Sequence, residues 1–191
     1  MTELHPLLAE RRSTRAFDAG RDLHRDELVA LLEAARWSPS AGNSQPWRFG
    51  VATRGSAAYD GLFASLAPGN QAWAGNVSAL VLAAAITPGP DGTPLPWAHY
   101  DTGQAVAHLT VQAQALGLDV HQMGGFDRDA AAAVFDLGVG VEPLVVVAVG
   151  LHDAQLTLPE PFASRETASR NREPINELLL TPVVAALPLS A

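Results

Sequence analysis

Apolar residues recur along the first half of the chain with two different spacings. Between Asp26 and Trp37 they fall at helical spacing, which predicts an amphipathic helix with the inward positions Leu28, Leu31, Leu32 and Ala35. The run SALVLAAAIT (78–87) is continuously apolar and contains Val and Ile, so it predicts a buried strand. Three further elements are expected before it: a short helix at 3–11, a strand near 47–53 and a helix at 55–67.

The second half continues with a long helix at 101–118, which Gly117 ends. Its apolar positions recur at helical spacing among small residues: Ala105, Leu109, Ala113 and Leu116. Because Ala covers most sides of this helix, we expect it to be buried. Asp127 is the expected N-cap of another helix, and the β-branched run EPLVVVAVGL (142–151) predicts a central strand.

After Pro159 the chain is polar, with a last short helix expected at 172–180. The tail beyond about residue 155 has little to bury against in its own chain, and such a tail often wraps a partner subunit. Helices and strands alternate without repeats or a linker, so the 191 residues predict one domain, 1–191, with α/β or α+β layering.

Composition and charge exclude several classes of protein. The formal net charge of −8 argues against binding nucleic acid through bulk electrostatics. The absence of cysteine excludes disulfides, thiolate metal sites and cysteine nucleophiles. The run VSALVLAAAI is about half as long as a membrane span requires, and the N-terminus lacks the pattern of a signal peptide, so the cytoplasm is the expected location.

The chain also contains no lysine, and all twelve basic residues are arginine. A lysine Schiff base and a Walker lysine are therefore impossible. Arginine prefers planar, bidentate partners such as phosphate. GC-rich coding is an alternative explanation for a chain rich in Ala and Arg, and we prefer it to a functional explanation for the absence of lysine.

Two arginine clusters stand near the ends of the chain. The motif ERRSTRAF places Arg11, Arg12, Ser13 and Arg15 within five residues, where an anion would relieve the repulsion between guanidinium groups. A solvated basic turn at a helix C-terminus is the alternative. In SRNREP, Arg170 and Arg172 could complete the same phosphate site or belong to a solvated tail.

Three loops between the clusters are rich in polar or small residues. The first, SPSAGNSQPW (38–47), is longer than a helix-to-strand connection needs; it could bind a ligand or satisfy its own backbone. In NQAW, Asn70 could bind a ligand or cap a turn. In HQMGGF, Gly124 and Gly125 would let a flat ring approach the backbone, although a simple glycine turn is the commoner case.

Other catalytic patterns are absent from the sequence. GVGVEP runs into a strand rather than a helix, so it is not a dinucleotide-binding fingerprint. The six histidines lack metal-ligand spacing, and we expect no metal site. His108, on the long helix, is expected to be a satisfied core residue.

Taken in order, these motifs resemble the FMN-dependent nitroreductase family over about residues 7–178. The most specific parts are RRSTRAF and SPSAGNSQPW, followed by NQAW and GLDVHQMGGF. The resemblance implies an α+β, three-layer α/β/α sandwich whose central, mostly antiparallel sheet is flanked by helices. It also implies an intertwined homodimer with FMN at the interface and the C-terminal tail on the partner.

The resemblance assigns roles to residues at both ends of the chain. The N-terminal motif, which holds the FMN phosphate and ribityl chain in the family, corresponds to Arg11, Arg12, Ser13 and Arg15. The C-terminal phosphate clamp corresponds to Arg170 and Arg172. The loop that comes from the other subunit and lies along the flavin corresponds to Pro39, Ser40, Ala41 and Asn43, and Gln45 can reach the same region.

The remaining contacts lie in the middle of the chain. Asn70 matches the contact to the pyrimidine edge of the flavin. Trp73 stands three positions on, where the family often has a basic residue. Met123, Gly124 and Gly125 match the backbone segment that faces the ring near N5.

The function implied is hydride transfer from NADPH or NADH through flavin N5 to a nitroaromatic, quinone or similar small acceptor, in ping-pong order. No side chain is assigned as a catalytic acid or base; His121 is the nearest polar candidate. The short loop at 87–96 makes a large substrate lid unexpected. The alternatives are a flavin-dependent oxidase or dehydrogenase, a flavin-binding protein without turnover, and a domain whose arginines are merely solvated.

Overall fold

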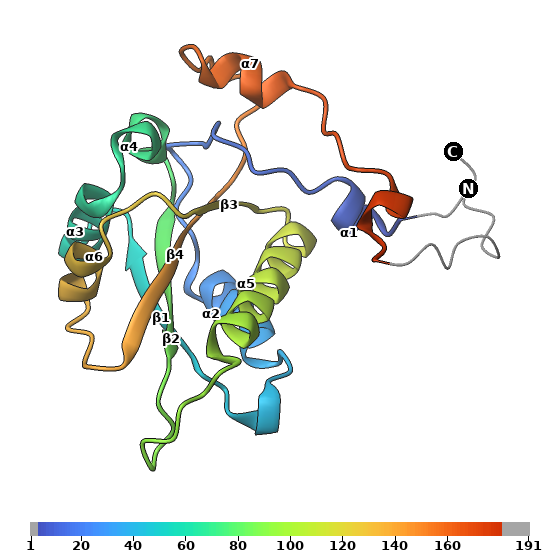
Figure 1. The fold of residues 1–191 in the computed structure, drawn as a ribbon. Helices are drawn as coiled ribbons and strands as arrows, with labels where there is room; N and C mark the ends of the chain where they lie inside the picture. The colour runs from blue at the N-terminus through green and yellow to red at the C-terminus, as the bar shows by residue number, and fades with distance from the viewer. Residues whose placement is uncertain (1–3, 181–191) are drawn as a thin grey trace.

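A four-stranded antiparallel sheet forms the centre of the fold (Figure 1). The computed structural model describes residues 4–180. The strands are β1 (Trp47–Thr53), β2 (Ala79–Ile86), β3 (Asp119–Met123) and β4 (Val141–Gly150), in the order β1-β2-β4-β3. The two strands with continuous apolar runs, β2 and β4, therefore occupy the middle of the sheet, where both faces are covered.

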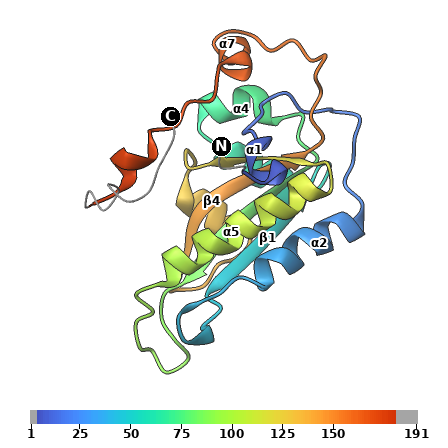
Figure 2. The same ribbon diagram turned by 90° about the vertical axis from the view of Figure 1, so that its right-hand side faces the viewer.

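Helices cover both faces, which gives the three layers that the family resemblance implies. Figure 2 shows α5 (Ala98–Ala115) and α2 (Arg25–Arg36) crossing one face of the sheet, where Leu31 and Leu109 pack against β2 and β4. Helices α3 (Ala57–Ser65) and α6 (Arg128–Val134) cover the other face. The predicted cap of α6 is confirmed, because the Asp127 side chain accepts a hydrogen bond from Ala130 N.

Several short elements differ from the expectation. The first helix, α1, spans only Pro6–Ala9, and the last predicted helix is a 3₁₀ turn, η2 (Ile175–Leu178). Helix α4 (Pro68–Ala74), helix α7 (Phe162–Thr167), the turn η1 (Ala41–Asn43) and strand β3 were not predicted. Each is short, so its apolar positions are too few to establish a period.

Helix α5 is half-buried rather than buried. Ala105, Leu109 and Ala113 face the sheet, whereas Ala107 and His108 are exposed. The prediction that His108 is a core residue is therefore wrong; its Nδ1 atom lies 2.6 Å from the Oγ atom of the buried Ser38. Alanine is compatible with either environment, so an Ala-rich pattern does not identify the buried face.

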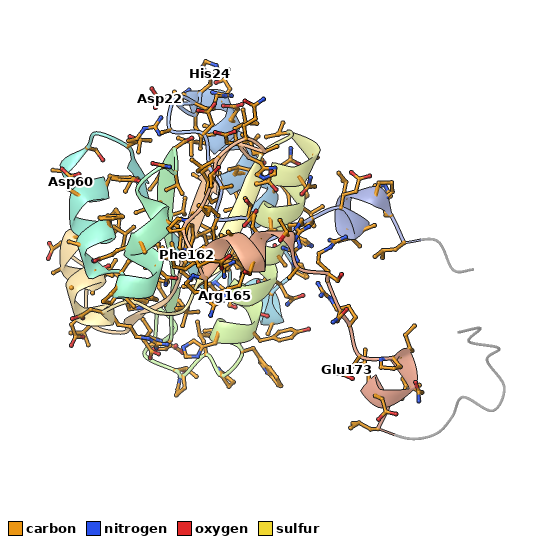
Figure 3. All side chains as sticks on the ribbon, turned by 90° about the horizontal axis from the view of Figure 1, so that it is seen from above. Asp22, His24, Asp60, Phe162, Arg165 and Glu173 are labelled. Atoms are coloured by element: carbon orange, nitrogen blue, oxygen red, sulfur yellow. The ribbon has the colours of Figure 1, made fainter. Side chains whose placement is uncertain are left out.

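The C-terminal segment leaves the body of the molecule. Figure 3 shows Phe162 and Arg165 of α7 above the sheet, whereas Glu173 stands well to the side. Residues 167–180 are exposed throughout, including the apolar side chains of Ile175, Leu178 and Leu180. The tail beyond residue 166 thus buries little against its own chain, as expected, whereas Leu158 is buried and Phe162 packs against the core. Residues 181–191, where the expected tail ends, lie outside the described residues.

Candidate functional site

The N-terminal basic motif lies across one end of the sheet. Phe17 forms a β-bridge with His152, directly after β4, and Asp18 N donates to Leu151 O at 2.9 Å. Arg11 and Ser13 line a cavity of about 390 Å³ together with residues of α1, α5 and β3: Leu8, Ala107, Thr110, Val111, Val120 and Gln122. Two of the predicted phosphate ligands therefore meet at one cavity.

Arg170 of the second arginine cluster lies against the first cluster. Arg170 donates hydrogen bonds to the backbone carbonyls of Arg11 (2.6 Å) and Ala9. Arg12 in turn donates to the carbonyls of Glu166 and Ala168. The guanidinium groups of Arg12 and Arg170 thus hold the C-terminal segment against the basic motif, whereas Arg172 contacts only the carbonyl of its neighbour among the described residues.

Glu166 is a central residue of this region that sequence reasoning missed. Its carboxylate accepts hydrogen bonds from Thr14 Oγ1 and from the backbone N–H of Arg15 (2.9 Å). Glu166 is about 150 residues away in sequence, so no local pattern signals the contact. Burial lowers the pKa of Arg15, as does the charge of Arg165, while Glu166 opposes the shift.

Trp73 connects the basic motif to α4 and β3. Its side chain is 4% exposed, and its ring lies 4.5 Å from that of His121 and 6.1 Å from that of Phe17, centroid to centroid. The guanidinium carbon of Arg15 lies 6.0 Å from the same ring, at the outer limit of a cation–π contact. A positive charge therefore stands beside Trp73 even though position 73 itself is not basic.

His121 is held in one tautomer by its partner. Its Nδ1 atom lies 2.9 Å from the carbonyl oxygen of Thr14, and a carbonyl can only accept, so Nδ1 carries the proton. Burial lowers the pKa of His121, and the charge of Arg15 acts in the same direction; hydrogen bonds to the Thr14 and Ser13 backbone partly oppose them. His121 is therefore a neutral packing and hydrogen-bonding residue at neutral pH.

Replacing His121 with Gln is expected to remove a pH-dependent part of the stability. Because folding lowers the pKa of His121, only the unfolded chain takes up this proton as the pH falls below about 6.5, and stability falls with it, by at most about 1.4 kcal/mol per pH unit. Gln keeps an N–H donor for Thr14 but does not titrate. Urea unfolding at pH 7.5, 6.5 and 5.5 measures the free energy of unfolding of both proteins. The excess of the wild type over His121→Gln should shrink as the pH falls, whereas an excess that is the same at all three pH values would contradict the prediction.

Asn70 and the Met-Gly-Gly segment lie side by side at the same end of the molecule. Asn70 Nδ2 donates to Gly125 O at 2.9 Å, and Ala67 N donates to the same oxygen at 3.0 Å. The Met123 side chain is buried in the core, while Gly124 and Gly125 are exposed. The segment thus presents backbone to solvent, in agreement with the role that the resemblance implies.

The loop after α2 is built as a separate unit at the other end of the sheet. Ala41 N donates to Asp101 Oδ2 at 3.0 Å, and Gln45 N donates to Ser40 Oγ at 3.0 Å. Asn43 and Gln45 adopt positive φ angles of 56° and 47°. The loop leads into the start of β1, which pairs with the end of β2 at Ala85.

This placement separates the predicted flavin contacts into two groups. The seven residues of β1 span about 20 Å at about 3.3 Å per residue, and the basic motif lies at the far end of the sheet, beyond the end of β4. Pro39, Ser40 and Ala41 therefore do not meet Arg11 within one chain. The separation agrees with the implied role of the loop, which is to contact the flavin of another subunit.

A larger cavity beside the basic motif is not the one expected to bind phosphate. It has a volume of about 650 Å³ and lies between the basic motif and α7. Its lining includes Arg12 and His152 but also the carboxylates of Glu10, Asp119, Asp153 and Glu166. These carboxylates would repel a phosphate dianion, so the cavity beside Arg11 and Ser13 is the better candidate.

Residues 4–180 lack two features that would point to other functions. No group of three or more His, Asp or Glu side chains in that range is arranged to hold a metal ion. Within the same range, no helix combines the length and apolar character needed to cross a membrane.

Comparison with known proteins places the fold in a family. The family model described as "Nitroreductase family" matches residues 8–151. The chain belongs to the nitroreductase family. A crystal structure described as an oxidoreductase containing FMN is 33% identical, with a TM-score of 0.88, and the match covers 95% of this chain and 92% of that one.

Curated bacterial proteins are similar to parts of the chain. An uncharacterised 15.4 kDa protein of Mycolicibacterium smegmatis is 37% identical over 131 residues, or 66% of this chain and 87% of that protein. The oxygen-insensitive NAD(P)H nitroreductase of Enterobacter cloacae is 46% identical over 44 residues, or 23% of this chain and 20% of that enzyme. The resemblance seen in the sequence is thereby confirmed, and the chain is assigned to a family of oxidoreductases.

Proposed function

We propose that this chain is an FMN-dependent NAD(P)H oxidoreductase that acts as a homodimer of single-domain subunits. Bound FMN would supply hydride transfer at its N5 atom, so the protein needs to provide orientation and charge rather than a nucleophile. NADPH or NADH and then the acceptor would occupy one site in turn, in ping-pong order. The acceptor class is a nitroaromatic, a quinone or a similar small molecule.

The observation that carries the proposal is the gathering of four predicted segments at one end of the sheet. The basic motif, Asn70, the Met-Gly-Gly segment and Arg170 are joined there by the contacts described above. The donors fit the cofactor, because the half-buried guanidinium of Arg11 and the hydroxyl of Ser13 line one cavity and suit a phosphate dianion. An added Cβ on Gly125 would lie 3.3 Å from Asn70 Nδ2 and 3.4 Å from the Ala67 Cβ, so a side chain at position 125 would crowd Asn70.

Under this proposal each segment has a definite role. Phosphate and ribityl binding falls to Arg11, Arg12, Ser13, Arg15, Arg170 and Arg172. Asn70 binds the pyrimidine edge of the ring, with Trp73 supporting it from within the protein. Met123, Gly124 and Gly125 face the ring near N5. A second copy of the chain contributes Pro39, Ser40, Ala41, Asn43 and Gln45.

The surface of the single chain supports the homodimer. One face of α5 is exposed or half-exposed although it carries small and apolar residues, including Gly103, Ala107 and Val111. Leu180 and Leu178 in the tail are also exposed. Exposed apolar surface of this kind is typical of protein interfaces.

The visible spectrum of the purified protein tests the proposal directly. We expect a yellow protein that releases FMN on heat denaturation and is bleached by NADPH or NADH without oxygen. Addition of a quinone or nitroarene should then restore the colour. A colourless protein that takes up no added FMN would contradict the proposal, and a yellow protein that neither nicotinamide bleaches would favour an oxidase or a non-catalytic flavin-binding protein.

A further inference from the structure

A small hollow lies at the N-terminal end of α5, against the loop that follows α2. It has a volume of about 270 Å³ and is lined by residues from both segments: Pro39, Ser40, Ala41, Trp97, Tyr100, Asp101 and Gln104. Trp97 and Tyr100 are 60% and 65% exposed. Their rings lie edge to face, with centroids 6.4 Å apart and planes at 76°.

The hollow is fixed in shape by a buried carboxylate. Asp101 is 2% exposed, and its Oδ2 atom accepts the hydrogen bond from Ala41 N. Its Oδ1 atom accepts a longer one from Gln104 Nε2, at 3.4 Å. Ser38 and His108 make a second link between the loop and α5. The two walls are therefore held together before any ligand arrives, which lowers the entropic cost of binding.

Trp97 has no evident role in folding. It occupies the N-cap of α5 but makes no side-chain capping hydrogen bond, at a position where Ser, Thr, Asp or Asn is preferred. The exposed Trp37 differs, because its indole N–H donates to Glu33 and its ring lies 5.3 Å from the guanidinium carbon of Arg36. An exposed aromatic pair without such local partners, beside a preformed hollow, is typical of a ligand contact.

We propose that Trp97 and Tyr100 form the wall that receives the flat conjugated ring of the electron acceptor. This inference rests on the proposed function, in which Pro39, Ser40 and Ala41 lie along the flavin of a second copy; the hollow is continuous with that surface. A neutral nitroarene or quinone gains aromatic contact there. An inorganic anion such as ferricyanide gains none, so the wall selects acceptors by shape and aromatic character.

Binding of 4-nitrobenzyl alcohol to the oxidised protein, measured by equilibrium dialysis without an electron donor, tests the wall directly. Trp97→Ala and Tyr100→Ala should each weaken binding about tenfold, because removing an aromatic stacking partner typically has an effect of this size. Trp97→Phe should retain binding within about twofold, since it keeps an aromatic ring. Trp37→Ala is the matched control for the loss of an exposed indole and should bind as the wild type does.

Kinetics distinguish this inference from the proposed function. With Trp97→Ala, the KM for the nitroarene should rise about tenfold, while reoxidation of the reduced flavin by ferricyanide should remain unchanged. Unchanged nitroarene binding and KM would contradict the proposed role of Trp97 and Tyr100. An equally large rise in the KM for ferricyanide would contradict it too, as would a variant whose only change is easier dissociation of the dimer. A protein without flavin would refute the proposed function, and the dialysis would still decide whether the wall binds the arene.

Discussion

Replacing Arg11 with Ala is expected to weaken FMN binding by about 10- to 100-fold, since a hydrogen bond to a charged group contributes about 1.5–3 kcal/mol. Arg11 is the arginine best placed to turn toward a phosphate. Its side chain is half-buried at the 390 Å³ cavity, and within residues 4–180 its hydrogen-bond partner is the hydroxyl of Ser13, at a long 3.4 Å. Arg12 and Arg170 are instead engaged by backbone carbonyls.

Fluorescence titration with FMN and with riboflavin measures this effect and identifies its origin. Riboflavin lacks the phosphate, so Arg11→Ala should leave its affinity unchanged within about twofold. Arg128→Ala, an exposed arginine at the start of α6, is the control for the loss of one positive charge. An equal loss of affinity for FMN and riboflavin would mean that Arg11 acts by maintaining the structure of the loop. Unchanged affinity for both flavins would mean that the phosphate binds elsewhere.

The fold was predictable where apolar patterns are long. The helices around Leu31 and Leu109 and the strands at 78–87 and 142–151 all carry enough buried positions to show their period, and the structure contains each of them. Strand β3 carries polar residues at Asp119 and Gln122 within only five positions, so it gave no such signal. Tertiary pairing with β4 determines that segment rather than local propensity.

The site was predictable as a set of segments but not as an arrangement. Local motifs pointed to the basic loop, to Asn70 and to the two glycines, and the structure joins these. The contacts of Glu166 with Thr14 and Arg15 depend on chain folding over about 150 residues, which no local pattern encodes. The family often has a basic residue at the position of Trp73, and the sequence did not show which residue supplies a positive charge there in this chain. The structure places Arg15 beside the Trp73 ring.

Pairing two inactive variants in one dimer is expected to restore about half of the wild-type activity. The expectation follows from the separation between the basic motif and the loop at 38–46, because a two-fold dimer can then build each site from both chains. Arg11→Glu places a carboxylate where the phosphate is expected to bind. Ala41→Trp fills the space along the flavin while leaving the backbone N–H of residue 41 available to Asp101. Each variant alone should therefore be nearly inactive.

The heterodimer carries one variant on each chain and can be isolated with two different affinity tags. If each site takes its basic motif from one chain and its loop from the other, one site in the heterodimer combines both defects and the second has neither. Bound FMN and nitroarene reduction should then both reach about half of the wild-type level. A heterodimer as inactive as its parents would show that each site is built within one chain.

A second heterodimer, with both substitutions on one chain, reverses the expected result. It also tests the alternative that pairing with a different chain restores activity only by stabilising the dimer. When both substitutions are on one chain and the other chain is wild type, sites shared between chains each contain one defect. This dimer should therefore be nearly inactive, although half of its chains are wild type, whereas sites built within single chains would leave about half of the activity. Since both dimers contain the same two substitutions, only the origin of the loop at 38–46 in each site can distinguish their activities.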